Sequence, residues 1–214
     1  QLIERDNKSF IFTSLGEEVV LQSKQLLTQA NELTDFCSAN GLPDHGKIKL
    51  GCIPTIAPFL LSDVVEKCHN ELPNLELFIR EDTTDNLLNL LAVGDLDVLI
   101  IALPVPVSQF HTKVVGRDYF YSVAPNHILK KIEQPGGFSN LPNKSVFLLT
   151  DEHCLTAHTI SACHLTDPEK INSFHATSLA TLLQMAEHHK GLTFLPKIAV
   201  DKGMVASSPL EYKP

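Results

Sequence analysis

Short apolar segments of strand length alternate with helical segments from Lys47 onward, and this alternation limits the chain to a few folds. A strand is expected at residues 98–102, where apolar residues follow one another without a polar break. A strand that is apolar on both faces suits a parallel sheet covered by helices on each side. The pattern comprises strands at 48–53, 75–80 and 98–102 and helices at 58–70 and 84–92. We therefore predict an α/β fold.

A second α/β unit is expected to begin near Tyr119, after a crossover at residues 114–118. It contains predicted strands at 145–149 and 192–195 and a predicted helix at 179–188. The simplest arrangement is two lobes that face each other across a cleft. The first lobe would comprise residues 47–118 and the second residues 119–214.

The first 46 residues follow a different pattern. Residues 3–12 contain two short strand-like pieces around a polar turn, which predicts a small hairpin. Thr13 or Ser14 then begins a helix that continues to about Asn40, and residues 41–46 form a turn-forming linker. A long amphipathic helix of this kind needs a partner, most simply a second copy of itself. Its apolar residues recur mostly at helical spacing and include Leu15, Val19, Leu26, Leu33 and Phe36.

The composition limits where the chain acts and what it binds. A net charge of -8 with 17 basic residues argues against nonspecific nucleic-acid binding by these residues. No apolar run approaches the roughly 18 to 20 residues of a membrane span, so we expect a cytoplasmic protein without a membrane segment. The five cysteines are an odd number, which disfavours a secreted disulfide framework and predicts reduced thiols at rest.

Cys154 and Cys163 stand nine residues apart, and this spacing constrains what the two thiols can do. If the intervening segment is helical, a rise of about 1.5 Å per residue separates them by more than about 12 Å. A disulfide requires Cα atoms within about 7 Å of each other. Oxidation to a disulfide would therefore unwind the segment and turn a chemical event into a change of shape.

Other interpretations of the cysteines stay open at this point. Both thiols can be buried apolar residues. We expect Cys37, Cys52 and Cys68 to be structural, with Cys52 in a buried strand and Cys37 and Cys68 on helices. A zinc site is disfavoured because no Cys-Xaa-Xaa-Cys pair occurs, so we expect no metal. All its ligands would come from one short segment, namely His153, Cys154, His158, Cys163 and His164.

Short motifs are spread along the whole chain, and their order is informative. They are Phe12-Thr13-Xaa-Xaa-Gly16, Gly51-Xaa-Ile53-Pro54-Thr55, Gly94-Xaa-Leu96-Asp97, Thr177-Ser178-Leu179 and Gly191-Leu192-Thr193-Xaa-Leu195-Pro196. This order resembles that of LysR-type transcriptional regulators. Within that wide family, His153-Cys154-Leu155 followed by Cys163 is similar to the OxyR family of hydrogen peroxide sensors. The spacing of the two cysteines is the specific part of the resemblance.

The resemblance implies a two-lobe regulatory domain like a periplasmic binding protein, preceded by a linker helix and a winged helix-turn-helix. The helices that read DNA bases would precede Gln1, and the chain stops at Pro214, short of the strands that usually complete the domain. The implied domains are a wing remnant at 1–13, a dimerisation helix and linker at 14–46, regulatory subdomain I at 47–118 and a truncated regulatory subdomain II at 119–214.

The resemblance also implies a redox sensor rather than an enzyme, with no cofactor. Cys154 is the expected peroxide-reactive thiol, and Cys163 is the expected resolving thiol that closes a reversible disulfide. Thr55, Thr84 and His153 are expected to bind peroxide between the lobes. The implied partners are DNA through the N-terminal domain, further copies of the chain in a homodimer or homotetramer, RNA polymerase and a disulfide-reducing system.

The sequence departs from the OxyR pattern next to Cys154. The family usually has Arg-Asp after His-Cys-Leu, whereas Thr156 and Ala157 stand here, and Glu152 replaces the usual Gly. A cationic neighbour of the thiolate is lost and an anionic one is gained, so both changes are expected to raise the pKa of Cys154. His158, one turn further on, is a candidate to compensate if it is protonated.

Two other functions remain open. A LysR-type regulator whose cleft binds a small anionic or aromatic effector would leave the cysteines incidental. A thiol-dependent peroxidase is the third interpretation, although the linker helix and the wing suit DNA architecture better than catalysis. Thr55 and Thr84 each precede a helical pattern, so capping of a helix N-terminus is the alternative to ligand binding there.

Overall fold

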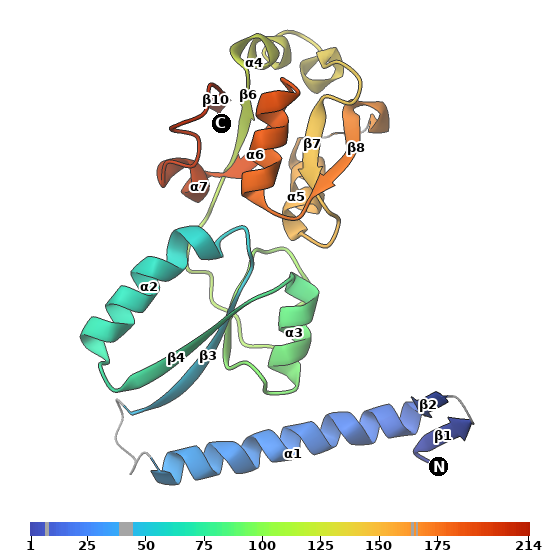
Figure 1. Ribbon diagram of the computed structural model, residues 1–214, viewed down its shortest axis with the longest axis vertical. Coiled ribbons are helices and arrows are strands. Elements are labelled where there is room, and N and C mark those ends of the chain that lie inside the picture. The colour runs from blue at the N-terminus through green and yellow to red at the C-terminus, as the bar shows by residue number, and fades with distance from the viewer. Residues whose placement is uncertain (7–8, 39–44, 164, 166) are drawn as a thin grey trace. The chain divides into compact units, whose positions relative to one another are not determined.

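The computed structural model describes residues 1–6, 9–38, 45–163, 165 and 167–214 of the chain (Figure 1). Contacts divide it into two compact units. The first unit contains Gln1–Cys52 and Ser62–Ile100, and the second contains Ile53–Leu61 and Ile101–Pro214. The chain therefore passes between the units more than once, and each unit combines early and late elements.

The first unit starts with the predicted hairpin, whose strands are β1 (Ile3–Asp6) and β2 (Ser9–Phe12). The two strands pair antiparallel, with Ile3 opposite Phe12. The predicted turn falls on residues 7–8, which lie outside the described residues. The hairpin itself is confirmed.

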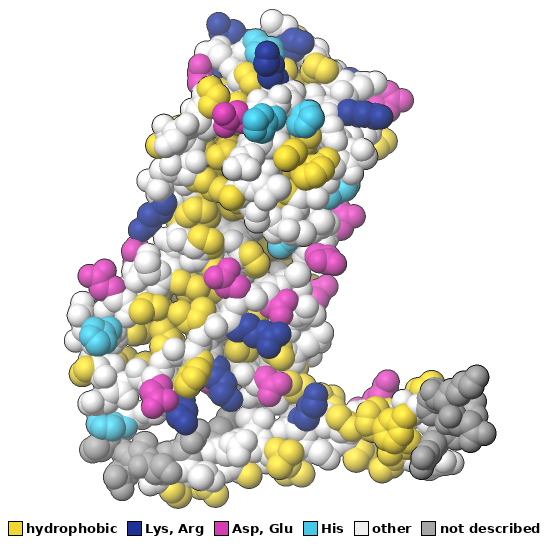
Figure 2. Space-filling model, viewed as in Figure 1, with side chains coloured by type: hydrophobic (Ala, Val, Ile, Leu, Met, Phe, Trp, Pro, Cys, Tyr) yellow, Lys and Arg dark blue, Asp and Glu magenta, His cyan; other side chains and the backbone are white. Residues whose placement is uncertain are grey.

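A single long helix, α1 (Ser14–Ser38), follows the hairpin as predicted. Thr13 Oγ1 accepts a hydrogen bond at 3.1 Å from the Gly16 amide and so caps the helix. The predicted helix end near Asn40 and most of the linker at 41–46 lie outside the described residues. Many apolar side chains of α1 are exposed, and Figure 2 shows yellow side chains along this helix. They are Leu15, Val19, Leu26, Leu27, Leu33 and Phe36.

The first unit also contains a three-stranded sheet with the order β4-β3-β5. Both strand pairs are parallel, so the prediction of a parallel sheet is confirmed here. Helices connect the strands, as the alternating pattern predicts. In chain order the elements are β3 (Gly46–Cys52), α2 (Ala57–Glu71), β4 (Leu75–Glu81), α3 (Thr84–Ala92) and β5 (Val98–Ile100).

The centre of this sheet is tightly packed, whereas its edges are open. A Cβ atom on Gly51 of β3 would lie 2.8 Å from side-chain atoms of both Leu87 and Leu96, so only glycine fits there without movement. Phe78 of the edge strand β4 and Val98 of the edge strand β5 are exposed. The predicted cover on both faces is therefore incomplete among the described residues.

The start of α3 is held by Asp82. Its Oδ1 accepts hydrogen bonds at 2.9 Å from the Thr83 amide and from the Asn86 side chain, and its Oδ2 lies 3.0 Å from Arg80 Nη2. The Asn86 hydrogen bond is the main reason that the pKa of Asp82 lies below its ordinary value, with smaller contributions from Thr83 and Arg80. This network makes Thr84, a predicted site residue, the first residue of α3.

Helix α1 contacts the last turn of α3. Gln25 Nε2 donates to the Ala92 carbonyl and Thr28 Oγ1 donates to the Val93 carbonyl, each at 3.2 Å. Carbonyls at a helix end lack partners within the helix, so α1 supplies them here. Gly94 follows with φ at +78°, and a Cβ atom on it would lie 2.5 Å from Thr28 Cγ2. Glycine thus permits both the left-handed turn and the close approach of α1.

The second unit combines antiparallel and parallel strand pairs. β6 lies between β10 and β9 and is antiparallel to both, whereas β7 and β8 are parallel. β6 and β10 were not predicted from the sequence, and no strand direction was predicted for this unit. The direction of a strand depends on pairing with distant segments, which a local apolar pattern does not report. The strands are β6 (Phe120–Ala124), β7 (Val146–Leu149), β8 (Ile171–Ala176), β9 (Thr193–Pro196) and β10 (Glu211–Lys213).

Helices pack around these strands and complete the core of the second unit. α6 has the predicted bounds, and Ser178 caps it by accepting a hydrogen bond at 3.2 Å from the Thr181 amide. Phe147 of β7 and Leu182 of α6 are almost fully buried in one apolar cluster. The helices are α4 (Asn126–Ile132), α5 (Cys154–Ala162), α6 (Leu179–His188) and α7 (Lys197–Asp201), with 3-10 turns at Gly137–Asn140 and Pro168–Lys170.

No helix in the described part of the chain combines the length and the apolar character that a membrane crossing requires.

Candidate functional site

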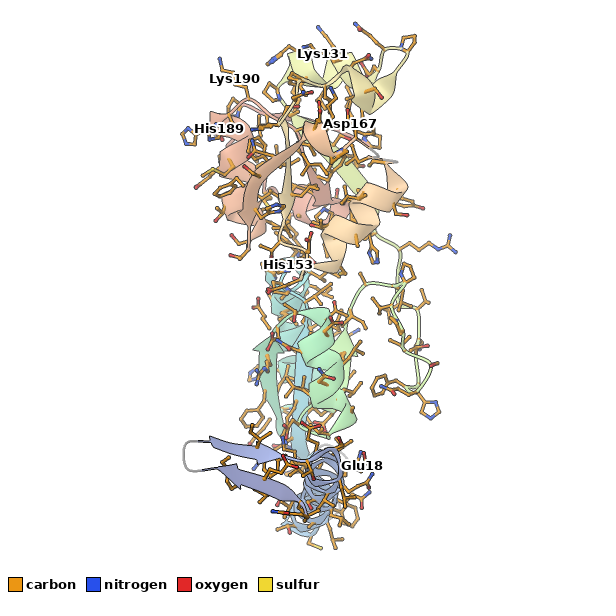
Figure 3. The ribbon with its side chains drawn as sticks, turned by 90° about the vertical axis from the view of Figure 1, so that its right-hand side faces the viewer. Glu18, Lys131, His153, Asp167, His189 and Lys190 are labelled. Atoms are coloured by element: carbon orange, nitrogen blue, oxygen red, sulfur yellow. The ribbon has the colours of Figure 1, made fainter. Side chains whose placement is uncertain are left out.

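The cysteine segment begins where β7 ends, and backbone hydrogen bonds hold it there. All residues of β7 are buried. The Thr150 amide donates to the Ala176 carbonyl of β8 at 2.9 Å, and the His153 amide donates to the Thr150 carbonyl at 3.0 Å. The resulting turn makes His153, which is labelled in Figure 3, the N-cap of α5. Cys154 is the first residue of the helix.

Cys154 lies at the N-terminal end of α5. The thiol is partly buried and belongs to the first turn of α5, where backbone amides carry partial positive charge. A helix N-terminus stabilises a thiolate for this reason. His153, the preceding residue, is only 8% exposed. The predicted helix after Cys154 is confirmed.

Cys163 lies at the opposite end of α5, at the C-cap. It packs with Ile160 against an apolar cluster of the second unit, and this burial raises the pKa of Cys163 above its ordinary value. The structure contains no disulfide among the five cysteines. The rise of a helix puts the ends of the Cys154 to Cys163 segment roughly 13 Å apart, well beyond the reach of a disulfide.

Two side chains of α5 bond to backbone carbonyls outside the helix. Thr156 Oγ1 donates to the Leu149 carbonyl of β7 at 2.9 Å in a buried position. His158 Nε2 lies 3.3 Å from the Pro104 carbonyl, in the segment between β5 and β6. A carbonyl oxygen only accepts, so Nε2 must carry the proton in this bond. Neither bond follows from the sequence, and the second joins residues 54 positions apart.

Three buried threonine hydroxyls, those of Thr84, Thr150 and Thr159, have no hydrogen-bond partner among the described residues. Thr159 belongs to α5 and is 1% exposed, and Thr84 starts α3 and is 5% exposed. Because the Thr84 hydroxyl bonds to no backbone amide of α3, the helix-cap interpretation is wrong for Thr84. Its hydroxyl retains its capacity for a ligand.

The residues predicted to bind peroxide come from separate parts of the chain. Thr55 is buried and belongs to the second unit, which also contains His153 and Cys154. Thr84 belongs to the first unit. The structure thus puts His153 beside Cys154 and Cys163 at the far end of the same helix. Joint action of the two threonines on a bound peroxide stays a prediction.

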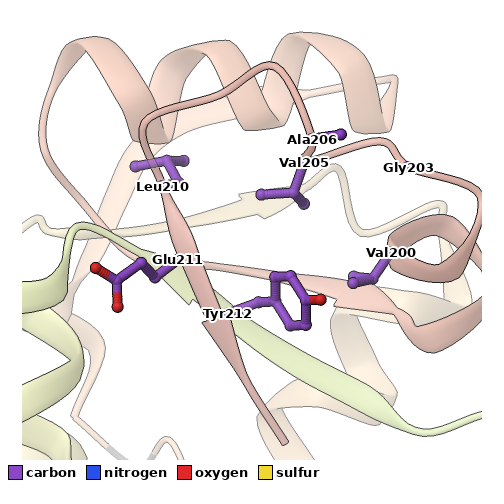
Figure 4. Close-up of a pocket in the computed structure, with 7 residues that line it drawn as sticks. All are labelled: Val200, Gly203, Val205, Ala206, Leu210, Glu211 and Tyr212. Carbon is purple, nitrogen blue, oxygen red and sulfur yellow. The ribbon is translucent and has the colours of Figure 1, made fainter.

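A pocket of about 340 Å³ lies elsewhere in the second unit, near its C-terminal strand (Figure 4). Its lining is about equally polar and apolar and contains none of the predicted site residues. The lining residues are Val200, Gly203, Val205, Ala206, Leu210, Glu211 and Tyr212.

The described residues contain no group of three or more His, Cys, Asp or Glu side chains that is arranged to hold a metal ion.

Comparison with protein families matches residues 42–214 to the LysR substrate binding domain. Among curated proteins, the transcriptional regulator EstR of Acinetobacter baylyi is 32% identical over 204 residues, which are 95% of this chain and 67% of EstR. The hydrogen peroxide-inducible genes activator of Haemophilus influenzae is 30% identical over 200 residues, 93% of this chain and 66% of that protein. The chain thus spans about two thirds of the length of these relatives.

Solved structures of other proteins are also similar to this chain. The reduced regulatory domain of OxyR2 from Vibrio vulnificus is 52% identical, with a TM-score of 0.72 over 78% of this chain and 79% of that chain. A full-length OxyR variant from Pseudomonas aeruginosa is 28% identical, with a TM-score of 0.67 over 100% of this chain and 73% of that chain. These matches confirm the predicted two-lobe fold of the periplasmic-binding-protein type.

In the reduced chain, Cys163 is expected to react more slowly with iodoacetamide than the exposed Cys37, because thiolates react and burial keeps Cys163 protonated. Timed alkylation between about pH 7 and pH 9, followed by peptide mass mapping, measures both rates. The rate for Cys163 should rise at higher pH than the rate for Cys37. The chain in denaturant is the control, in which the difference should vanish. Equal rates in the native chain would contradict the burial of Cys163.

Proposed function

Because this chain belongs to the family of LysR substrate-binding domains, we propose that it is the regulatory part of a cytoplasmic, hydrogen peroxide-responsive transcriptional regulator of the OxyR kind. The observation that carries the proposal is the position of Cys154 and Cys163 at the two ends of α5, in a chain similar to the OxyR2 regulatory domain. Cys154 reacts with peroxide, and a disulfide with Cys163 converts that reaction into a new conformation.

The first step is the oxidation of Cys154. Its thiolate attacks one oxygen of hydrogen peroxide, the O–O bond breaks, and the other oxygen leaves as hydroxide and takes up a proton to become water. The sulfur retains a hydroxyl group as a sulfenic acid. Amides at the start of α5 favour the thiolate, and His153 is beside it. The hydroxyls of Thr84 and Thr55 orient the peroxide; the unpaired Thr84 hydroxyl supports this role.

The second step joins the two cysteines. Cys163 loses its proton and attacks the Cys154 sulfur, the S–O bond breaks, and the hydroxyl leaves as water. Cys163 does not attack from its place in the intact helix, because the distance is too large and burial raises its pKa. Unwinding of α5 removes both obstacles, since it shortens the distance and exposes the thiol to water. The conformational change therefore accompanies the chemistry rather than following it.

Each molecule signals once and is reset by a disulfide-reducing system, so the protein is a sensor without turnover of its own. DNA binding belongs to a part of the full-length regulator outside this sequence. The altered regulatory part changes how paired DNA-binding parts meet their half-sites and how the regulator engages RNA polymerase. The exposed apolar residues of α1, including Leu26 and Leu33, pack against a second copy of the chain in a dimer or tetramer.

Treatment of the reduced chain with one equivalent of hydrogen peroxide is expected to yield a peptide pair linked through Cys154 and Cys163. Cys154→Ser abolishes the link because it removes the thiol that reacts with peroxide. Cys163→Ser stops the reaction at a sulfenic acid on Cys154, because no thiol resolves it. Peptide mapping with a sulfenic-acid trap distinguishes the three products.

The matched control for these variants is Cys68→Ser, in a partly buried helical cysteine outside the segment. It should leave the link intact. Retention of all thiols in the unsubstituted chain would instead favour a regulator that binds a small effector and has incidental cysteines. Sustained consumption of peroxide with a thiol reductant would favour a thiol-dependent peroxidase.

Thr84→Val is expected to slow the oxidation of Cys154 by about tenfold, because the variant keeps the shape of the side chain and loses the hydroxyl. Thr84→Ser keeps the hydroxyl and should stay close to the unsubstituted rate. Stopped-flow oxidation with excess peroxide measures the rate, and thermal unfolding checks that each variant is folded. Identical rates in the serine and valine variants would remove Thr84 from the peroxide site.

Leu26→Glu and Leu33→Glu together are expected to raise the dissociation constant of the dimer by at least about tenfold, because charges would be buried in an apolar helix interface. Sedimentation velocity at several protein concentrations measures the change. Val65→Glu in α2 is the control, since Val65 is also an exposed apolar helix residue but lies away from α1 in sequence. A dimer that persists in the double variant would exclude α1 as the interface.

A further inference from the structure

Helix α5 is held by two side-chain hydrogen bonds as well as by its own backbone. Thr156 reaches the Leu149 carbonyl of β7 at 2.9 Å, and His158 reaches the Pro104 carbonyl at 3.3 Å. The two acceptors come from different elements, a core strand and the segment between β5 and β6. The helix is therefore attached to its surroundings at two independent points.

Both attachments lie inside the segment that a disulfide would rearrange. Thr156 and His158 are the second and fourth residues after Cys154, and Cys163 is the ninth. Bringing the ends of this segment from roughly 13 Å to within about 7 Å displaces the residues between them by ångströms. Hydrogen bonds weaken steeply once the donor and acceptor move beyond about 3.5 Å. Disulfide formation thus breaks or distorts both attachments.

Thr159 favours opening of α5, whereas the hydrogen bonds of Thr156 and His158 oppose it. The Thr159 hydroxyl is buried in the helical form and has no hydrogen-bond partner among the described residues. Such a group loses its bonds to water without replacement, and it regains them when the helix opens. The helical form therefore contains two polar interactions that oppose opening and one buried hydroxyl that favours it.

We propose that Thr156 and His158 are positioning residues that hold α5 in its reduced, helical form and thereby set how readily Cys154 and Cys163 join. Thr159 lowers the barrier that they raise. This assignment rests on the proposed function, because it concerns the second step of the same reaction. Thr156 and His158 act on the opening of the helix, so they affect the step from sulfenic acid to disulfide.

His158 is tested with a pair of variants. His158→Leu removes the donor, whereas His158→Gln keeps a side-chain N–H at the same number of bonds from Cα. Loss of one hydrogen bond of ordinary strength predicts about fivefold faster conversion of the Cys154 sulfenic acid to the disulfide in the leucine variant. The glutamine variant should stay near the unsubstituted rate. Rapid quenching with a sulfenic-acid trap, followed by peptide mass mapping, gives the two products over time.

Thr156 and Thr159 give a test with opposite signs. Thr156→Val removes the donor to Leu149 and should speed the same step by about fivefold, whereas Thr156→Ser keeps the hydroxyl and should not. Thr159→Val removes the unpaired hydroxyl at nearly constant volume and should slow the step by a similar factor of about five. A substitution that merely loosened the fold would speed disulfide formation in every variant. A slower rate in Thr159→Val therefore distinguishes a positioning role from general destabilisation of the fold.

The equilibrium gives an independent readout. Interactions present only in the reduced form stabilise it, so their loss shifts the thiol–disulfide equilibrium with glutathione by about fivefold toward the disulfide. Unchanged rates and equilibrium in His158→Leu and Thr156→Val, alongside normal disulfide formation, would overturn this inference and leave the proposed function intact. Absence of any Cys154 to Cys163 link in the unsubstituted chain would reject the proposed function, and this inference with it.

Discussion

A helix between Cys154 and Cys163 keeps the two thiols apart, and neighbouring elements of the second unit hold both of its ends. α5 occupies the whole segment from Cys154 to the residue before Cys163, so the helical hydrogen bonds and a disulfide between its ends are mutually exclusive. β7 and the turn at Thr150 fix where the helix starts, and an apolar cluster holds its end. In the proposed function, the stability of helix α5 therefore opposes formation of the disulfide.

The same helix places its two thiols in different surroundings. Cys154 lies at the N-terminus, where backbone amides carry partial positive charge, whereas Cys163 lies at the C-terminal end, where burial raises its pKa. The proposed division of roles, with Cys154 reacting first, rests on this difference between the two ends of one element.

Sequence reasoning succeeded where local pattern decides the structure and failed where distant segments do. The bounds of α3 and α6 follow from apolar periodicity and polar residues at the helix start, and both were predicted to the residue. Strand β6 was not predicted, because it is stabilised by antiparallel pairing with β9, which lies more than 60 residues later. The bond from His158 to Pro104 was missed for the same reason, because it joins residues 54 positions apart.

The contact of α1 with the end of α3 has a mechanical consequence. Gln25 and Thr28 bond to the last carbonyls of α3, so these two residues act as a fulcrum near the middle of a 25-residue helix. The start of α1 lies roughly 20 Å from this fulcrum at about 1.5 Å per residue. A tilt of about 5° in α3 would then move the hairpin end by roughly 2 Å. A rigid helix whose middle is bonded to the end of α3 thus magnifies small rotations of α3 at its hairpin end.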